Sequence, residues 1–321
     1  MSELFAGVDL GGTGIKMVMG TRDGQTVAES QIPTLAHDGP EAVLCRIADA
    51  VEELAGKAGQ RPQAVGMGVP GLVDVANGIT RFLPNFPTQW RDIPAASVLQ
   101  ARLKCPVRLL NDVRTATLGE LTYGHGQQNS NLTMVFFALG TGIGGGVVID
   151  GKLRLGPLGA SGELGHQTII PDGPLCGCGN HGCLETLSSG TALAFEGARL
   201  MRIGRAPHLH LAVDGDADRV TSREMVAAAE AGDDAIRDAI VRSAGYLGLA
   251  VANVVTLLHP DLIVIGGGVA EIGSMLFDKV REVVNLRVRM LPAESVRIEP
   301  SLLGKRAGEL GALALAARGI G

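Results

Sequence analysis

Four side chains that bind metals lie close together near the middle of the chain: His166, Cys176, Cys178 and Cys183. The spacing H-x9-C-x-C-x4-C supplies four soft or borderline ligands, enough to complete a tetrahedral zinc shell with no open position. Glycines between the cysteines provide the turns that a metal knuckle needs. We therefore expect a structural zinc ion that stiffens a loop. The alternative is a chance cluster of buried thiols.

Two carboxylates flank this cluster, with Glu163 three residues before His166 and Glu185 two residues after Cys183. A zinc ion would fix the loop that carries both of them. A metal-bound imidazole also keeps a second ring nitrogen that can bond to a neighbour, such as a substrate hydroxyl. Carboxylates and an imidazole suit a hydroxyl-rich ligand such as a sugar. Alternatively, both glutamates belong to a solvated surface.

Three glycine-rich turns follow apolar strand patterns, at 11–14, 140–142 and 266–268. Successive backbone N–H groups without Cβ atoms form concavities that hold phosphate oxygens. The first two turns lead into another strand, which excludes a dinucleotide-binding turn, and neither matches G-x-x-x-x-G-K-[ST] of a P-loop. The third turn leaves room for adenine or ribose. Together the turns predict a nucleotide cleft; the alternative is tight hairpins that bind nothing.

Two charged residues border the first turn. Asp9 precedes it and could orient a bound magnesium ion through water, or it could cap an Asx-type turn. Lys16 follows it and is a candidate phosphate contact, or a solvated lysine at the end of a strand.

The strand pattern VRLL ends at Asn111 and Asp112, and a helical pattern follows. This is the edge at which open α/β sheets usually hold ligands. In phosphoryl transfer a positioned aspartate commonly accepts the proton of the attacking hydroxyl while Mg²⁺ neutralises the phosphates, and Asp112 is the candidate. It could also be the N-cap of the helix, or do both. Asn111 and Asn85 carry amides suited to adjacent hydroxyls, or could satisfy turns.

The elements around these residues repeat. Each half of the chain opens with a strand, a glycine turn, a second strand and another turn, so two related halves facing each other would form a cleft. Helical patterns cover 39–59, a segment capped by Thr221 or Ser222, about 235–258, and the C-terminal AGELGALALAARG.

Composition narrows the function. The chain has 321 residues, a net charge of −5 and a pI near 5.8, which gives no long-range attraction to nucleic acid. The N-terminus lacks a secretory signal pattern. The longest uncharged stretch, 243–260, fits a buried helix better than a membrane span. Clustered cysteines without an export signal indicate a reducing cytoplasm. We expect a cytoplasmic protein with small-molecule partners, without nucleic acid or membrane.

The chain resembles the ROK group of sugar kinases and repressors, within the actin-like, hexokinase-like ATPase superfamily. The likeness lies in DLGGTGIK (9–16), GVPGLVD (68–74), LPN (83–85), LLND (109–112), LGTGIGGG (139–146), GELGH (162–166), CGCGNHGCLE (176–185) and IVIGGGV (263–269). It implies an α/β fold of two actin-like, ribonuclease H-like lobes with mixed sheets and a cleft between them. The small lobe would be 1–124 plus 305–321, and the large lobe 125–304, with the zinc knuckle. A homodimer is expected.

Carried over residue by residue, the resemblance implies roles for specific positions. The ATP phosphates would contact Gly11, Gly12, Thr13, Lys16, Gly140, Thr141 and Gly142, and the adenosine would border Gly267 and Gly268. The sugar would contact Gly71, Asn85, Asn111, Glu163, His166 and Glu185, with Asp112 as the base toward the C6 hydroxyl. His166 would serve both zinc and sugar.

The sequence departs from the family pattern at two places. The family often shows Ala-Asn-Ala-Ala after the Asn-Asp pair, whereas this chain has Val113-Arg114-Thr115-Ala116. Ser161 stands before GELGH where alanine is usual. The bulky cation at 114 bears on the packing behind the base.

The expected reaction is ATP-dependent phosphorylation of a hexose at its C6 hydroxyl, glucose before others, with ATP, Mg²⁺ and structural Zn²⁺. Fructose, mannose, N-acetylglucosamine and N-acetylmannosamine stay open as substrates. A second class of function is a non-catalytic, sugar-sensing regulator. Family repressors carry a DNA-binding segment before the first glycine turn, and eight residues precede Asp9 here, so a kinase is favoured.

Overall fold

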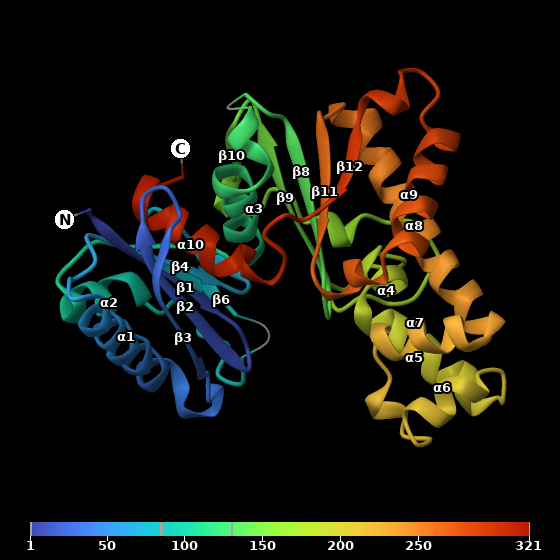
Figure 1. The fold of residues 1–321 in the computed structure, drawn as a ribbon, viewed down its shortest axis with the longest axis horizontal. Helices are drawn as coiled ribbons and strands as arrows, with labels where there is room; N and C mark the ends of the chain where they lie inside the picture. Colours follow the sequence, from blue (N-terminus) through green and yellow to red (C-terminus); the bar gives the residue numbers. More distant parts are fainter. Residues whose placement is uncertain (1, 84–85, 130, 321) are drawn as a thin grey trace. The chain divides into compact units, whose positions relative to one another are not determined.

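The computed structural model of the chain describes residues 2–83, 86–129 and 131–320. Its strands form two five-stranded sheets with the same plan (Figure 1). The first has the order β3 (Thr26–Pro33), β2 (Gly14–Thr21), β1 (Leu4–Leu10), β4 (Val65–Val69), β7 (Val107–Asn111). The second has the order β10 (Lys152–Arg154), β9 (Ile143–Ile149), β8 (Met134–Leu139), β11 (Leu262–Gly266), β12 (Arg297–Pro300). The predicted repeat of the opening elements is therefore confirmed.

Both sheets are mixed, as expected for an α/β fold. In the first, β1 runs antiparallel to β2 and parallel to β4, and β4 runs parallel to β7. In the second, β10 is antiparallel to β9, while β11 is parallel to β8 and β12. A two-stranded ribbon of β5 (Leu72–Asp74) and β6 (Ile79–Phe82) is separate from both sheets.

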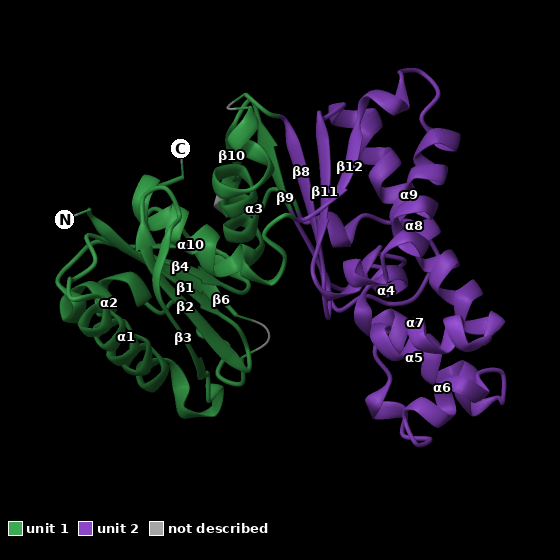
Figure 2. Cartoon of the chain, viewed as in Figure 1, with its two compact units in different colours: residues 1–132, 146–162, 302–321 green, residues 133–145, 163–301 purple. Residues whose placement is uncertain are grey.

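The chain divides into two compact units, 1–132 with 146–162 and 302–321, and 133–145 with 163–301 (Figure 2). The first unit holds helices α1 (Gly39–Ala58), α2 (Ala95–Leu103), α3 (Asp112–Tyr123) and α10 (Ala307–Arg318). The second holds α4 (Glu185–Ser188), α5 (Gly190–Arg202), α6 (Pro207–Ala212), α7 (Ser222–Ala231), α8 (Asp234–Leu258) and α9 (Ser274–Arg287).

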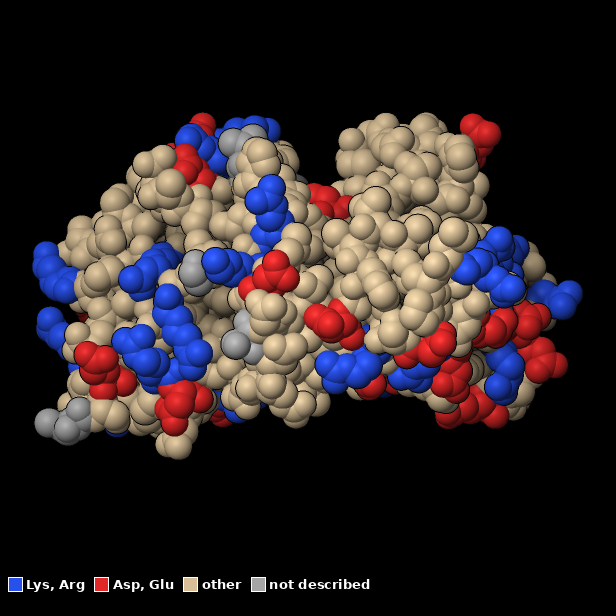
Figure 3. All heavy atoms as spheres, turned by 90° about the horizontal axis from the view of Figure 1, so that it is seen from above, with Lys and Arg blue, Asp and Glu red and all other residues tan. Residues whose placement is uncertain are grey.

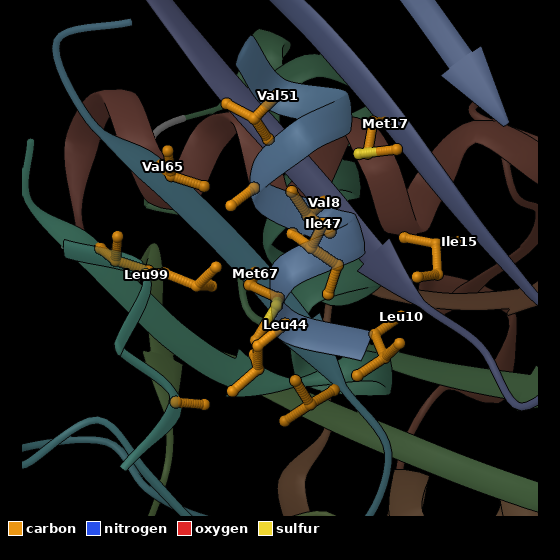
Figure 4. Packing of buried hydrophobic residues seen from close by; sticks show 14 of the residues in the cluster. Val8, Leu10, Ile15, Met17, Leu44, Ile47, Val51, Val65, Met67 and Leu99 are labelled. Atoms are coloured by element: carbon orange, nitrogen blue, oxygen red, sulfur yellow. The ribbon is translucent and has the colours of Figure 1, made fainter. Parts of the chain in front are cut away.

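The first sheet is covered on both faces because its strand residues alternate between two cores. Val8 and Leu10 point toward Leu44 and Ile47 of α1 (Figure 4). Residues of opposite parity, such as Phe5, pack with α10 instead. On that face, a Cβ atom at position 7 would collide with the backbone of α10, so the close approach of this helix requires glycine. Period-two alternation thus sets which helix covers which face.

In the second unit, the long helix α8 packs along α9. Among the described helices, α8 is the one long and apolar enough to cross a membrane by composition, but twelve of its residues are buried inside the fold. The predicted buried helix over about 235–258 is confirmed. On the face drawn in Figure 3, basic and acidic side chains are interspersed.

Strand direction decides which loops meet. Because β1, β4 and β7 are parallel neighbours, their carboxyl ends lie at one edge of the first sheet. The register pairs Asp9 with Gly68 and Val69 with Asn111. In the second sheet, β8 and β11 are parallel and pair Ala138 with Gly266. The glycine turns and the Asn-Asp pair all follow such strand ends.

Candidate active site and metal centre

The turn from β7 into α3 holds three of the predicted site residues together. The amide of Asn111 donates to the carbonyl of Gly71 at 3.1 Å and to Asp112 Oδ1 at 2.9 Å. Gly71 lies at φ 82°, a left-handed conformation that favours glycine. Thus residues 40 positions apart in sequence meet at the shared edge of β4 and β7.

Asn111, rather than Asp112, caps helix α3. Its Oδ1 accepts from the backbone N–H groups of Val113 at 3.1 Å and Arg114 at 3.2 Å. Asp112 is the first residue of the helix, and its Oδ1 accepts from the Val113 N–H at 2.8 Å. The alternative of Asp112 as N-cap is therefore wrong, because its neighbour already occupies that position. The Asn111 amide and the Val113 N–H both bind Oδ1 of the Asp112 carboxylate.

Two half-buried carboxyls at this edge have perturbed acidity. Burial raises the pKa of Asp112 above its ordinary value, while the Val113 N–H, the Arg114 charge and the Asn111 amide oppose that shift. The pKa of Asp9 is raised to about 6, first by burial and then by the charge of Asp112, with Lys16 opposing and Glu309 adding. Carboxyls shifted toward neutrality suit proton transfer.

The first glycine turn is a tight connection between β1 and β2. The N–H of Gly11 donates to the carbonyl of Gly14 at 3.0 Å. Buried Thr34 binds the inner side of the turn, with its N–H on the Thr13 carbonyl at 3.0 Å and its hydroxyl on the Gly11 carbonyl at 2.6 Å. Gly12 is exposed, and a Cβ atom there would meet nothing within 4 Å. The turn is anchored from within and open outside.

Lys16 lies beside this turn, paired with Asp9 across β1 and β2. Its Nζ donates to the carbonyl of Lys305 at 3.2 Å, just before α10. The ammonium group is therefore held near the first turn by a backbone carbonyl as well as by the Asp9 charge.

The second glycine turn joins β8 to β9 and is fixed by Glu185. The N–H of Gly140 donates to the Gly142 carbonyl at 2.9 Å, and Glu185 Oε2 accepts from the Ile143 N–H at 2.8 Å. The N–H of Gly190, at the start of α5, donates to the Gly140 carbonyl at 2.8 Å. Glu185, predicted to contact the sugar, thus also binds the backbone of the predicted phosphate turn.

The third glycine turn lies against the second. Gly267 has φ 87°, and a Cβ atom there would lie 2.9 Å from the backbone N of Leu139 and would overlap the carbonyl of that residue. Only glycine permits this approach. A Cβ atom at Gly268 or Gly140 would meet nothing within 4 Å, so both positions border open space. The structure thus places Gly267 against Leu139, the residue just before the second turn, while Thr141 is exposed.

The four predicted metal ligands converge. Among the described residues, His166, Cys176, Cys178 and Cys183 form the one such group, with ligand atoms all within 4.8 Å of one another. Cys176 Sγ lies 3.6 Å from His166 Nδ1, and Cys178 Sγ lies 3.7 Å from Cys183 Sγ. A tetrahedral zinc ion with bonds of about 2.3 Å to sulfur and about 2.1 Å to nitrogen spaces its ligands about 3.6 to 3.8 Å apart. The cluster fits zinc, with Nδ1 as the ligand nitrogen.

The GELGH segment carries the remaining predicted sugar contacts. His166 donates its backbone N–H to the Glu163 carbonyl at 3.1 Å, within a short 3-10 turn. A Cβ atom at Gly165 would overlap the Ile143 carbonyl, so glycine lets this turn pack against the start of β9. The Glu163 side chain is exposed. Asn85 lies outside the described residues.

One residue of this region had no predicted role. Arg114 is 2% exposed, and its guanidinium binds Asn111 Oδ1 at 3.0 Å and the Ser161 carbonyl at 2.8 and 3.1 Å. The sequence feature that points to Arg114 and Ser161 is that both positions depart from the family pattern. Spacing gives no reason to place these two positions in contact.

Comparison with known proteins agrees with these motifs. Residues 5–319 match the model of the ROK family. A glucokinase of Halalkalibacterium halodurans is 36% identical over 96% of this chain and 93% of its own length. A xylose repressor of Caldicellulosiruptor bescii is 31% identical over 96% of this chain and 77% of the repressor.

A solved structure extends the likeness to the fold. The ROK family glucokinase of Streptomyces griseus, in complex with glucose and AMPPNP, superposes with a TM-score of 0.84 and is 32% identical. The match covers 98% of this chain and all of that one.

Proposed function

The chain belongs to the ROK family, and we propose that it is a kinase that transfers the γ-phosphoryl group of ATP to glucose. The glucokinase relatives and the glucose and AMPPNP complex support this activity. The observation that carries it in the structure is the half-buried Asp112 carboxylate, which Asn111 and the Val113 N–H fix at the start of α3.

Asp112 accepts the proton of the C6 hydroxyl as that oxygen attacks phosphorus, because its raised pKa makes it a better base than an exposed aspartate. Gly71 and Asn111 belong to the sugar contacts that the family motif implies, and the Asn111 amide also holds the Gly71 carbonyl and Asp112 Oδ1 in place. Glu163, His166 and Glu185 bind further hydroxyls, with His166 using Nε2 because Nδ1 faces the metal cluster. Asn85 is assigned to the sugar by the family motif alone.

The phosphates are bound by the glycine turns, at 11–13 and 140–142, through backbone N–H groups, with Lys16 adding a positive charge. Gly267 and Gly268 border the adenosine. When bound, Mg²⁺ would neutralise phosphate charge, and Asp9 would be the residue that orients it, through water. Zinc supplies rigidity to the loop that ends at Cys183.

The proposal also includes the larger organisation that the family implies. The lobes that the family implies, 1–124 with 305–321 and 125–304, have the actin-like fold and enclose the substrates in a cleft. They differ from the compact units chiefly in that 146–162 is grouped with the first unit. The protein is a homodimer in the cytoplasm.

A coupled assay of ADP release tests the activity. With ATP and Mg²⁺, we expect phosphorylation of glucose to exceed that of fructose, mannose, N-acetylglucosamine and N-acetylmannosamine. A different preferred sugar would correct the substrate. Binding of a sugar by calorimetry without phosphorylation of any would favour the second candidate, a sugar-sensing regulator, which the similarity to a xylose repressor supports.

Asp112→Asn tests the base. The Oδ1 atom of the new amide can still accept from Val113 N–H and the Asn111 amide, so folding and glucose binding should persist. Turnover should fall by about a hundredfold or more, because the proton acceptor is lost. Asp238→Asn, the same change at an exposed carboxylate of α8, is the control and should leave turnover unchanged. Turnover of Asp112→Asn near that of the unchanged protein would remove Asp112 as base.

A further inference from the structure

Arg114 is a buried arginine in the first turn of α3, next but one to Asp112. Its guanidinium donates from Nη1 to Asn111 Oδ1, and from Nε and Nη2 to the Ser161 carbonyl. Burying a guanidinium costs free energy unless its donors are satisfied and its charge is balanced. A fork with this geometry cannot be replaced by a lysine, which has one nitrogen at the end of its chain.

The first consequence concerns the amide of Asn111. Its Oδ1 accepts from Val113 N–H, Arg114 N–H and Arg114 Nη1. Three donors around one atom exclude the flipped amide, which would bring its own N–H groups against them. Nδ2 must therefore face the Gly71 carbonyl and Asp112 Oδ1, as observed. Arg114 helps to decide which end of Asn111 faces the proposed sugar site.

The second consequence concerns the segment before GELGH. Ser161 lies two residues before Glu163, and its own N–H donates to the Leu155 carbonyl at 2.8 Å. Both backbone polar groups of Ser161 are therefore hydrogen-bonded: the N–H to Leu155 and the carbonyl to Arg114. Arg114, Asn111 and Ser161 belong to the same compact unit. Positions 114 and 161, which both depart from the family pattern, are thus in direct contact through the hydrogen bonds from Arg114 to the Ser161 carbonyl.

The charge of Arg114 also acts on the proposed base. It opposes the effect of burial on the pKa of Asp112. Charged groups that act at this edge include Asp9 of β1, whose pKa Asp112 itself raises, and Lys16 of β2 and Glu309 of α10, which act on Asp9. On the α3 side, Arg114 supplies a positive charge.

On the basis of the proposed kinase function, we propose that Arg114 is a positioning residue for phosphoryl transfer. It clamps the Asn111 amide and the Ser161 carbonyl, so that the β7–α3 turn with Asn111 and Asp112 keeps one geometry against the segment that ends at Ser161. The residue does not touch the reacting atoms; it acts through Asn111, Asp112 and Ser161.

Two substitutions separate the roles of charge and geometry. Arg114→Met removes both, and we expect kcat/KM for glucose to fall about tenfold to a hundredfold, since buried charged hydrogen bonds are lost. The acidic limb of the pH profile of kcat/KM should also move to higher pH in this variant, because the loss of a nearby cation raises the pKa of Asp112. Arg114→Lys keeps the positive charge, so it should restore the position of the acidic limb but not the KM for glucose. Arg108→Met is the matched control, because exposed Arg108 also donates to a backbone carbonyl, Ala316 at 2.7 Å, away from the site.

Calorimetric glucose binding and thermal unfolding accompany the kinetics. A weaker glucose Kd in both Arg114 variants, with Arg108→Met unchanged, supports the proposal; wild-type kinetics, Kd and pH profile in Arg114→Met overturn it. If Arg114→Met does not fold, Arg114→Lys decides: a wild-type KM and Kd in that variant overturn the role of the fork. If the unchanged protein binds glucose but transfers no phosphoryl group, the proposed kinase function fails. The glucose Kd values of the Arg114 variants then decide by themselves whether Arg114 positions the sugar site.

Discussion

Substitution of Gly311 by alanine should destabilise the first unit, because helices α3 and α10 cross at glycines. A Cβ atom on Gly311 would overlap the Thr115 carbonyl oxygen and lie 2.6 Å from its carbon and 3.2 Å from the Gly119 N. On the facing helix, a Cβ atom on Gly119 would lie 3.0 Å from Gly311 Cα. These obstacles are helix backbone, which cannot rotate away as a side chain can.

The magnitude follows from two opposing effects. Ordinary contact begins at 3.4 Å, so the Thr115 carbonyl carbon alone would have to retreat by about 0.8 Å (3.4 − 2.6). Overpacking of this kind costs about 1–3 kcal/mol and sometimes more. Alanine regains about 1 kcal/mol of helix propensity. With backbone against backbone, we expect a net loss of about 2 kcal/mol, which lowers Tm by about 4–8 °C for a unit of this size.

Gly56→Ala is the matched control. Gly56 is an exposed residue of α1, and a Cβ atom there meets nothing within 4 Å, so only the propensity gain remains. That variant should be more stable by about 0.5–1 kcal/mol. Thermal unfolding followed by circular dichroism measures both variants. An unchanged or raised Tm for Gly311→Ala would refute the idea that the close crossing of these helices is obligatory.

Two further predictions concern the metal and the half-buried Asp9. Cys178→Ser should release zinc, measured by elemental analysis, and weaken glucose binding about tenfold or more, because the loop bearing Glu185 loses its anchor. The control is Cys45→Ser, at an exposed cysteine outside the cluster, which should keep both zinc and glucose binding. Loss of zinc with unchanged glucose affinity would show that the metal and the sugar site are not coupled. Asp9→Asn should raise stability at pH 8 by up to about 3 kcal/mol and change it little at pH 4. The folded-state pKa of about 6 exceeds the ordinary 3.8, so wild-type stability is complete below about pH 4 and falls as pH rises through 6. Equal Tm differences at pH 4 and pH 8 would contradict that sign.

Short-range features could be predicted from the sequence because their physical cause is local. The helix over 39–59 is α1 from Gly39 to Ala58, and the C-terminal Ala- and Leu-rich segment is α10. Thr221 does cap α7, accepting from the Arg223 N–H at 3.2 Å.

Features that depend on distant partners are not specified by spacing. The sequence predicts that Glu185 contacts the sugar, and the structure adds that its carboxylate accepts from the Ile143 N–H of the second glycine turn, 42 residues earlier. By its position Asp112 could cap the helix, whereas Asn111 is the cap in the structure. In each case the choice between neighbouring polar groups depends on backbone directions that side-chain spacing does not specify.

By itself, the sequence determined the motifs: glycine turns between strands, a ligand set spaced for one tetrahedral ion, and an acidic residue where a strand becomes a helix. These follow from conformational freedom, donor chemistry and hydrophobic period, all of which act over a few residues. Only the tertiary structure decided that Asn111 donates to Gly71, that Gly267 packs against the backbone of Leu139, and that Arg114 donates to Ser161. Those meetings are set by the register of parallel strands and the packing of helices, which join segments tens of residues apart.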